Sequence, residues 1–290
     1  MNDLDETIAV IGLGNMGAAM ARTLTRKGFS VSGCDTRPER ARELPPGARF
    51  TSDLAEACRG ARVLILSLPS SREVELVAST ILEAASVGAV VIDTSTSDPD
   101  STRRLEPRFA ARGFGFVDAP VSGGAAGAEA GTLGMMVGGR DDMIARVRPI
   151  LEAMAGKIVV IGGPGAGHVG KLVNNLLIAQ HLITTAEAVK LARRAGLDAA
   201  RLLEAVNASS GRSGASETCF PKWVLSGTFD SGFTMGLMRK DVRLAIALAE
   251  KLGVNLDLGR VAATLWVDSA ASQPDAADFN RIAEWVEAKS

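Results

Sequence analysis

The feature that most constrains the fold is the segment Gly12-Leu13-Gly14-Asn15-Met16-Gly17, which follows the apolar run Ile8–Ile11. In this spacing between a strand and a helix, the first glycine permits a tight turn and the second lets the backbone approach a pyrophosphate. The third lets the helix pack closely on the strand, and the helix N-terminus faces the phosphate charge. The segment therefore predicts a dinucleotide-binding loop from Gly12 to Gly17 rather than an ordinary glycine-rich turn.

Asp35 ends the next apolar run, Val31–Asp35. A carboxylate at this place can accept hydrogen bonds from both hydroxyls of an adenosine ribose, and it repels a 2′-phosphate. Arg37 and Arg40 follow and could accommodate that phosphate if Asp35 turned away. We therefore expect NAD as the cofactor, with NADP as the open alternative.

Short apolar runs alternate with amphipathic stretches through the first half of the chain. The predicted strands are 8–11, 31–35, 63–68, 89–92, 115–117, 135–137 and 158–161, and the helices between them include 16–27, 73–85, 100–112 and 141–154. Buried runs that alternate with helices are typical of a mainly parallel sheet covered on both faces. We expect an α/β Rossmann-type N-terminal domain over residues 1–164.

The pattern changes at the breaker cluster Gly162-Gly163-Pro164-Gly165-Ala166-Gly167. The stretch 169–195 lacks proline and has apolar residues at helical spacing, so at 1.5 Å per residue it predicts a helix about 40 Å long. The segments 199–208, 220–225, 235–252, 259–272 and 278–289 also have helical patterns, and no strand is predicted among them. We expect residues 165–290 to form a long interdomain helix and an all-α C-terminal domain.

Composition excludes several kinds of partner. With 32 Lys and Arg against 33 Asp and Glu in 290 residues, the chain offers no basic surface for nucleic acid or an anionic membrane. It has no apolar run of the roughly 18 residues that span a membrane, and its N-terminus does not resemble a signal peptide. Cys34, Cys58 and Cys219 have no metal-type spacing, and we expect small core residues without a disulfide or a metal. A soluble cytoplasmic protein is expected.

Three further segments follow predicted strands, where ligands of open α/β sheets bind. They are Ser67-Leu68-Pro69-Ser70, Asp93-Thr94-Ser95-Thr96 and Asp118-Ala119-Pro120-Val121-Ser122-Gly123-Gly124. For the first two, a simpler interpretation is helix capping by Ser70 and Ser97. In the third, the two glycines after a serine expose backbone N–H groups that can hold a carboxylate.

Hydride transfer to or from a carbonyl needs an acid/base group near the oxygen. The chain has no Tyr and two His, and neither His181 in mid-helix nor His168 at a helix start is a clear candidate. Lys171 and Asn175 are four residues apart and so lie on one helix face near its N-terminus. Partial desolvation and the positive helix end favour a neutral amine. The spacing alone leaves Lys171 open as a tunable base or an ordinary surface lysine.

Together these segments resemble the β-hydroxyacid dehydrogenase family, whose members include 3-hydroxyisobutyrate dehydrogenase, tartronate semialdehyde reductase and threonate dehydrogenase. Four motifs match in family order across nearly the whole chain. They are Gly12-Leu-Gly-Asn-Met-Gly17, Asp118-Ala-Pro-Val-Ser-Gly-Gly124, Gly165-Ala-Gly-His-Val-Gly-Lys171-Leu-Val-Asn174-Asn175 and Lys240-Asp241.

The resemblance implies a role for each matching position. Lys171 would be the general acid/base, and Asn175 would orient it or the substrate oxygen. The substrate would be bound by Ser122, Gly123, Gly124 and Asn174, with its carboxylate on the first three. The nicotinamide half of the cofactor site would be lined by Leu68, Pro69 and Thr96, and Lys240 would close over the cofactor. Without the resemblance, Lys240 would be an ordinary solvated helix residue.

The implied reaction is NAD-dependent oxidation of a small 3-hydroxy acid to its semialdehyde or keto acid, or the reverse, in a homodimer or homotetramer. One alternative is an NADPH-preferring semialdehyde or glyoxylate reductase, which Asp35 disfavours. A non-catalytic dinucleotide-binding scaffold and an imine reductase are both disfavoured by the presence of Lys171. Gly214 stands where many relatives have a bulky residue, and we expect it to enlarge a substrate pocket lined by Phe233 and Met235. Arg212 would either bind a second anionic group or cap the local structure.

Overall fold

The structure, a computed structural model, describes residues 7–289, and among these the chain divides into two compact units. The first unit extends to Lys171 and the second begins at Leu172. This division falls inside the long helix α7 (Ala166–Arg194). The boundary predicted from the sequence, at residue 164, lies just before this helix begins. The first turns of α7, which include Lys171, therefore belong to the first unit.

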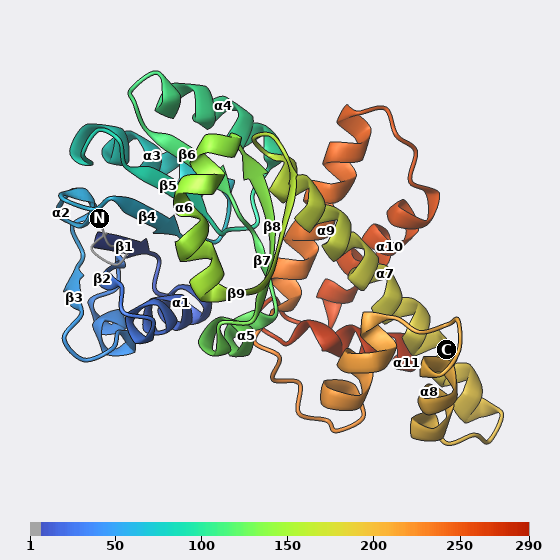
Figure 1. The fold of residues 1–290 in the computed structure, drawn as a ribbon. Helices are drawn as coiled ribbons and strands as arrows, with labels where there is room; N and C mark the ends of the chain where they lie inside the picture. Colours follow the sequence, from blue (N-terminus) through green and yellow to red (C-terminus); the bar gives the residue numbers. More distant parts are fainter. Residues whose placement is uncertain (1–6, 290) are drawn as a thin grey trace. The chain divides into compact units, whose positions relative to one another are not determined.

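Within the described residues, the first unit contains a nine-stranded sheet (Figure 1). The strands are β1 (Thr7–Ile11), β2 (Ser30–Cys34), β3 (Arg49–Thr51), β4 (Val63–Leu66), β5 (Val90–Asp93), β6 (Gly115–Asp118), β7 (Val121–Ser122), β8 (Leu133–Gly139) and β9 (Ala155–Gly162). Strands β3-β2-β1-β4-β5-β6 are parallel in this order, β8 is antiparallel to β6 and β7, and β9 is parallel to β8. The strand order reverses between β1 and β4, which is where such sheets bind ligands. The Rossmann-type prediction is confirmed.

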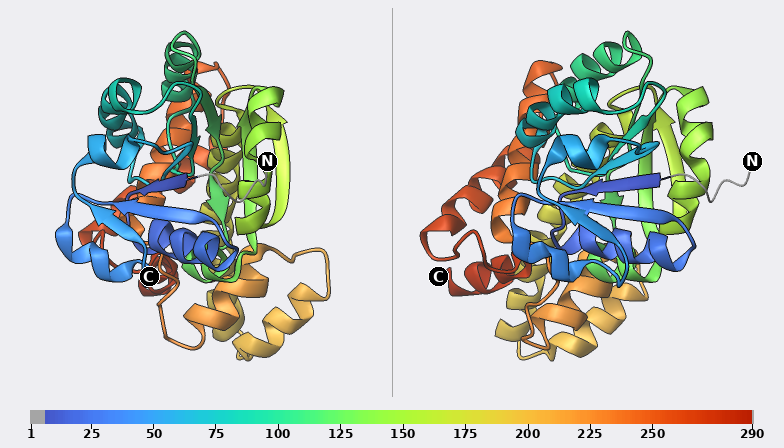
Figure 2. Two further views of the ribbon diagram at one scale, coloured as in Figure 1. Left: turned by 60° about the vertical axis from the view of Figure 1, so that its left-hand side comes forward. Right: turned by 90° about the vertical axis from the view of Figure 1, so that its left-hand side faces the viewer.

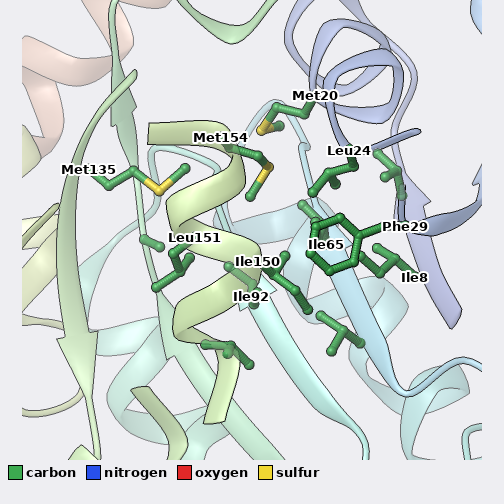
Figure 3. Close-up of a cluster of buried hydrophobic side chains, with 14 of the residues drawn as sticks. Ile8, Met20, Leu24, Phe29, Ile65, Ile92, Met135, Ile150, Leu151 and Met154 are labelled. Atoms are coloured by element: carbon green, nitrogen blue, oxygen red, sulfur yellow. The ribbon is translucent and has the colours of Figure 1, made fainter. Parts of the chain in front are cut away.

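Helices cover both faces of this sheet, as the views in Figure 2 also show. They are α1 (Asn15–Arg26), α2 (Leu54–Cys58), α3 (Ser71–Ala84), α4 (Pro99–Ala110), α5 (Gly124–Ala130) and α6 (Asp141–Met154). Alternate residues of β1 enter different cores: Ile8 packs with α1 and α6, whereas Ala9 packs with α2, α3 and α4. Figure 3 shows the first of these cores, with Leu24 of α1 and Ile150 of α6 beside the strands. The full burial of both strand faces explains the nearly continuous apolar runs in the sequence.

The second unit is helical, as predicted. It contains the rest of α7, then α8 (Ala199–Asn207), the wide helical turn η3 (Ala215–Val224), α9 (Met235–Lys251), α10 (Asp257–Asp268), the short turns η4 (Ser269–Ala271) and η5 (Phe279–Arg281), and α11 (Ile282–Ala288). Its core contains Trp266, whose indole Nε1–H donates to the carbonyl of Ala179 at 3.2 Å. This bond satisfies a buried donor and ties α10 to the middle of α7.

Several short elements were not predicted, among them the turn η2 (Pro38–Glu43). Strands β3 and β7 are three and two residues long, too short for a periodic pattern. Helix α5 consists of glycine, alanine and one glutamate, so its sequence lacks an apolar stripe. Cys34, Cys58 and Cys219 are buried, as expected of small core residues. Among residues 7–289, no helix is long and apolar enough to cross a membrane, and no group of three or more acidic, His or Cys side chains is placed to hold a metal ion.

Candidate functional site

The glycines of the loop before α1 have different surroundings. Gly12 has a φ of 91°, and a Cβ added there would lie 2.3 Å from the carbonyl oxygen of Ser67. A Cβ on Gly17 would lie 1.9 Å from the carbonyl oxygen of Gly12. A Cβ on Gly14 would meet no atom of the described residues within 4 Å. The protein's own backbone thus requires Gly12 and Gly17, whereas Gly14 leaves open space at the start of α1, which fits the close approach of a pyrophosphate.

The other loop residues complete this turn. Leu13 is buried in the core, Met16 is half-buried against it, and Asn15 is exposed. The backbone N–H of Leu13 donates to the Asp35 carboxylate at 2.8 Å, so the loop is attached to the end of β2. The predicted cofactor-loop residues and Asp35 are therefore brought together.

Asp35 is buried and carries its charge close to this loop. Its carboxylate also accepts the backbone N–H of Arg37 at 3.0 Å and pairs with the Arg37 guanidinium at 3.4 Å. Burial opposes ionisation, but the donors from Arg37 and Leu13 and the Arg37 charge outweigh it and hold the pKa of Asp35 below its usual value. Asp35 is therefore a carboxylate at neutral pH.

The segments after β4 and β5 are joined by a hydrogen bond from the backbone N–H of Leu68 to the Ser95 hydroxyl at 3.0 Å. Leu68 and Thr96 are half-buried and Pro69 is exposed. Ser70 caps α3, as the simpler interpretation expected. That interpretation is wrong for Ser97, because its hydroxyl donates to Asp93 at 3.2 Å while Asp98 caps α4.

The segment Ser122–Gly124 leads from β7 into α5. Ser122 is half-buried, and Gly123 and Gly124 are exposed with φ of 120° and 63°. Side chains rarely adopt this left-handed backbone, so glycine is required at this turn. The exposed turn lies on the same segment as Asp118, the last residue of β6.

Asp118 connects this segment to the helix that bears Lys171. Its fully buried carboxylate accepts the backbone N–H groups of Gly165 at 2.8 Å and His168 at 3.1 Å, at the start of α7. Lys171 follows on the same helix and is only 8% exposed, so its interpretation as an ordinary surface lysine is wrong. Sequence reasoning did not select Asp118, although a carboxylate ending an apolar strand was a usable signal.

A second polar cluster lies in the helical unit around the buried Asp241. The Asn175 amide Nδ2 donates to Asp241 Oδ2 at 2.5 Å, and its Oδ1 accepts from Asn174 Nδ2 at 3.0 Å. Lys240 Nζ lies 3.1 Å from Asp241 Oδ1, and its side chain is 18% exposed, so Lys240 is not simply solvated. Asn174, Asn175 and Lys240 are thus brought together by Asp241, which sequence reasoning did not select.

The residues that the sequence predicted around a substrate pocket differ in how far they are exposed. Met235 is fully buried in the core of the helical unit, so the expectation that it lines a pocket is wrong. Phe233 is half-buried and packs edge to face on Phe279. Gly214 is exposed, and a Cβ there would be 3.7 Å from Ile178, which leaves room beside it. Arg212 is exposed.

Two family models match the chain. Residues 7–162 match the family model described as the NAD-binding domain of 6-phosphogluconate dehydrogenase. Residues 165–286 match the model described as the NAD-binding part of NADP-dependent 3-hydroxyisobutyrate dehydrogenase.

Individual relatives align along nearly their whole length. The 3-hydroxyisobutyrate dehydrogenase of Pseudomonas aeruginosa is 38% identical, over 95% of this chain and 96% of the relative. The NAD-dependent L-serine dehydrogenase of the same organism is also 38% identical, over 89% of this chain and 90% of its own. The structure of Mycobacterium tuberculosis 3-hydroxyisobutyrate dehydrogenase with L-serine is 36% identical, covers 98% of this chain and all of its own, and has a TM-score of 0.91.

The glycine loop on a Rossmann-type sheet, followed by a helical unit, defines an oxidoreductase that acts on CH–OH groups with NAD or NADP. Within this class, the chain belongs to the β-hydroxyacid dehydrogenase family.

Proposed function

We propose that this protein oxidises small acids of the form HOCH₂–CHR–COO⁻ to the corresponding semialdehydes, or catalyses the reverse reduction, with NAD as cofactor and Lys171 as general acid/base. 3-Hydroxyisobutyrate and L-serine, which appear in the names of the relatives, share this form and differ in R, a methyl or an amino group. The alcohol carbon lies one bond from the carbon that bears the carboxylate. A site for this class must therefore hold an anion and a proton acceptor close together.

The observation that carries the proposal is the attachment of both parts to Asp118. Its backbone leads directly into the Ser122–Gly124 turn, and its carboxylate holds the first turn of α7, whose next turn bears Lys171. The turn offers backbone N–H groups for the substrate carboxylate, and the buried lysine offers an amine for the hydroxyl proton.

In the oxidation, Ser122, Gly123 and Gly124 hold the carboxylate and so fix the position of the hydroxymethyl group. Neutral Lys171 accepts the hydroxyl proton at Nζ as the carbinol C–H bond breaks and the C–O bond becomes a carbonyl. NAD held at the Gly12–Gly17 loop would supply the nicotinamide ring as the hydride acceptor. In the reduction, protonated Lys171 returns the proton to the carbonyl oxygen. Asn175, one turn further along α7, orients the reacting groups through its amide, which Asp241 and Asn174 hold in one orientation.

The preference for NAD is supported by the ionised Asp35 carboxylate beside the glycine loop. A 2′-phosphate on the ribose would be repelled by this charge. Arg37, which could otherwise neutralise such a phosphate, is paired with Asp35. Roles for Leu68, Pro69, Thr96 and Lys240 toward the cofactor, assembly as a homodimer or homotetramer and a cytoplasmic location stay predictions.

Turnover of the Lys171→Ala variant tests the proposal. With NAD and either 3-hydroxyisobutyrate or L-serine, we expect kcat to fall about 10²–10⁴-fold, the usual contribution of general acid–base catalysis. The dissociation constant for NADH, measured by fluorescence titration, should stay within about twofold, because the cofactor loop is unchanged. Lys157→Ala removes an exposed lysine from β9 of the first unit and is the matched control, with no expected effect on kcat.

Other outcomes would favour the alternatives. Full activity in Lys171→Ala would remove the assignment of this residue. NADH binding without turnover of any acid in the class would favour a non-catalytic scaffold. A higher kcat/KM with NADPH and a semialdehyde than with NADH would favour the NADPH-preferring reductase.

A further inference from the structure

A buried cluster of three ionisable side chains lies behind the candidate active site of the first unit. Asp93 and Asp118 are partners in register at the ends of the neighbouring strands β5 and β6, and His168 comes from the first turn of α7. All three residues are fully buried. Two carboxylates buried away from water destabilise the fold unless hydrogen-bond donors or positive charges compensate them. The contacts of each carboxylate therefore decide whether it is tolerated.

Asp118 is compensated by backbone groups. Its carboxylate accepts the backbone N–H groups of Gly165 and His168. These groups lie at the positive end of α7, where backbone N–H groups have no acceptor within the helix. This approach needs small residues, since a Cβ on Gly138 would lie 2.7 Å from Asp118 Oδ2 and one on Gly167 would lie 2.4 Å from the carbonyl oxygen of Met136. The first turn of α7 is therefore packed directly on β6 and β8.

Asp93 is compensated by side chains as well. Its carboxylate accepts the backbone N–H of Ser95 at 2.9 Å and the hydroxyl of Ser97 at 3.2 Å. His168 Nε2 lies 3.3 Å from Oδ2, within ion-pair distance but without the geometry of a hydrogen bond. Burial opposes ionisation, but the imidazole of His168 and the Ser95 donors outweigh it, so the pKa of Asp93 is below its usual value. His168 is thus the side chain by which α7 contacts the charged end of β5.

The cluster reaches the segments that carry the candidate site residues. Ser95 lies beside Thr96, and its hydroxyl accepts the N–H of Leu68. Asp118 leads to Ser122. His168 precedes Lys171 by three residues, which is nearly one helical turn and places both on one side of α7.

We propose that His168, held by Asp93, is a positioning residue for Lys171, fixing the first turn of α7 so that the lysine amine is aligned with the bound hydroxy acid. This inference rests on the proposed role of Lys171. The imidazole would act by anchoring the helix start, not by exchanging protons with the substrate. Removal of the anchor should therefore impair the proton-transfer geometry and leave the cofactor loop around Gly14 intact.

His168→Leu and His168→Gln form the test pair. Leucine has no donor for Asp93, whereas the glutamine amide nitrogen can take the place of Nε2. For His168→Leu we expect kcat to fall about 10–100-fold, because small misplacements of a reacting group have costs of this size. KM for the hydroxy acid and the dissociation constant for NADH should stay within about threefold, and His168→Gln should recover most of kcat. An equal loss of kcat in both variants would overturn the inference.

Val189→Ala is the matched structural control, since Val189 is buried near the other end of the same helix. It should lower the melting temperature without lowering kcat, which separates positioning from a loss of stability. If His168→Leu does not fold, Asp93→Asn provides the same test, because it keeps the volume and weakens the acceptor. Retention of full kcat in Asp93→Asn would then overturn the inference.

Combining His168→Leu with Lys171→Ala distinguishes failure of this inference from failure of the proposed function. If His168 acts through Lys171, adding His168→Leu to Lys171→Ala should lower the residual turnover by less than about twofold. The effects of substituting residues that act as a unit are not additive. An equal factor in both backgrounds would indicate a general structural effect and overturn the inference. Normal turnover in Lys171→Ala alone would overturn the proposed function itself.

Discussion

Glycine is needed in the cofactor loop for two different reasons. Gly12 and Gly17 are required by contacts within the protein, whereas Gly14 has an ordinary backbone conformation, φ −67° and ψ −172°, and open space beside it. A methyl group at position 14 would therefore be tolerated by the fold but not by a pyrophosphate that approaches the start of α1.

Gly14→Ala tests this difference at the scale of a single residue. The variant should keep the melting temperature of the natural protein while its dissociation constant for NADH rises at least about tenfold, equivalent to about 1.4 kcal/mol. Gly12→Ala is the contrasting variant, because it forces a side chain into a left-handed backbone at a cost of about 1–3 kcal/mol from conformation alone. Calorimetry and fluorescence titration measure the two effects, and unchanged NADH affinity in Gly14→Ala would contradict the assignment.

Residue type and spacing identified Lys171 as a candidate, but its burial was only an expectation. Asp118, Asp241 and His168 all lie in the matched motifs, but residue type and spacing did not indicate their roles. Their hydrogen-bond partners lie 47–66 positions away in the sequence, and His168 and Asp93 lie on different elements. The error at Ser97 has a different reason, because its partner Asp93 is only four residues away. Ser97 stands just before a helix, yet its hydroxyl contacts the buried Asp93.

At the scale of elements, α7 depends on close backbone packing at its start. Gly165 has a φ of 84°, and Gly167 leaves no space for a side chain against β8. The breaker cluster that the sequence placed before the helix is therefore partly a docking surface for the sheet. Its glycines allow the helix N-terminus to reach the Asp118 carboxylate.

Gly167→Ala should weaken this docking. The added methyl would lie 2.4 Å from a backbone oxygen, and overpacking of this kind costs about 1–3 kcal/mol. Gly163→Ala is the matched control, since a Cβ there meets no described atom within 4 Å. Urea unfolding followed by circular dichroism gives the free energy of unfolding for each variant. Equal values for the two would show that the close approach has no energetic weight.

At the scale of the whole molecule, buried ionisable groups should limit stability at both ends of the pH range. The pKa values of Asp35 and Asp93 are lower in the folded state than their ordinary value of 3.8. The stability that these groups contribute is therefore fully present above about pH 4 and is lost as the pH falls through the folded-state values.

The buried thiols limit stability at alkaline pH instead. Burial raises the pKa of Cys34 and Cys219 from 9.0 to about 11 and that of Cys58 to about 12. The stability that these thiols contribute is fully present below their unfolded-state pKa of 9.0. It is lost as the pH rises from there through the folded-state pKa values, because the thiols of the unfolded chain ionise first.

The melting temperature should consequently be highest between about pH 5 and 8 and decline on both sides. Scanning calorimetry from pH 3 to 10 measures this profile. Cys58→Ala should make the alkaline decline shallower, and Asp93→Asn should make the acidic decline shallower. An unchanged slope on the corresponding side would show that the substituted group does not control it.

The sequence by itself determined the Rossmann-type sheet, the long helix and the helical second unit, because strand and helix periodicities and the glycine loop are local patterns. It also determined the chemistry available, through the absence of Tyr and the positions of Lys171 and Asp35 in motifs. Only the tertiary structure decided that Lys171 is buried, that Asp118 joins the Ser122–Gly124 turn to α7, and that Asp241 fixes Asn175. The burial of Lys171 arises from tertiary packing, and the other two features arise from hydrogen bonds between residues distant in sequence. For neither does a single chain carry a local pattern.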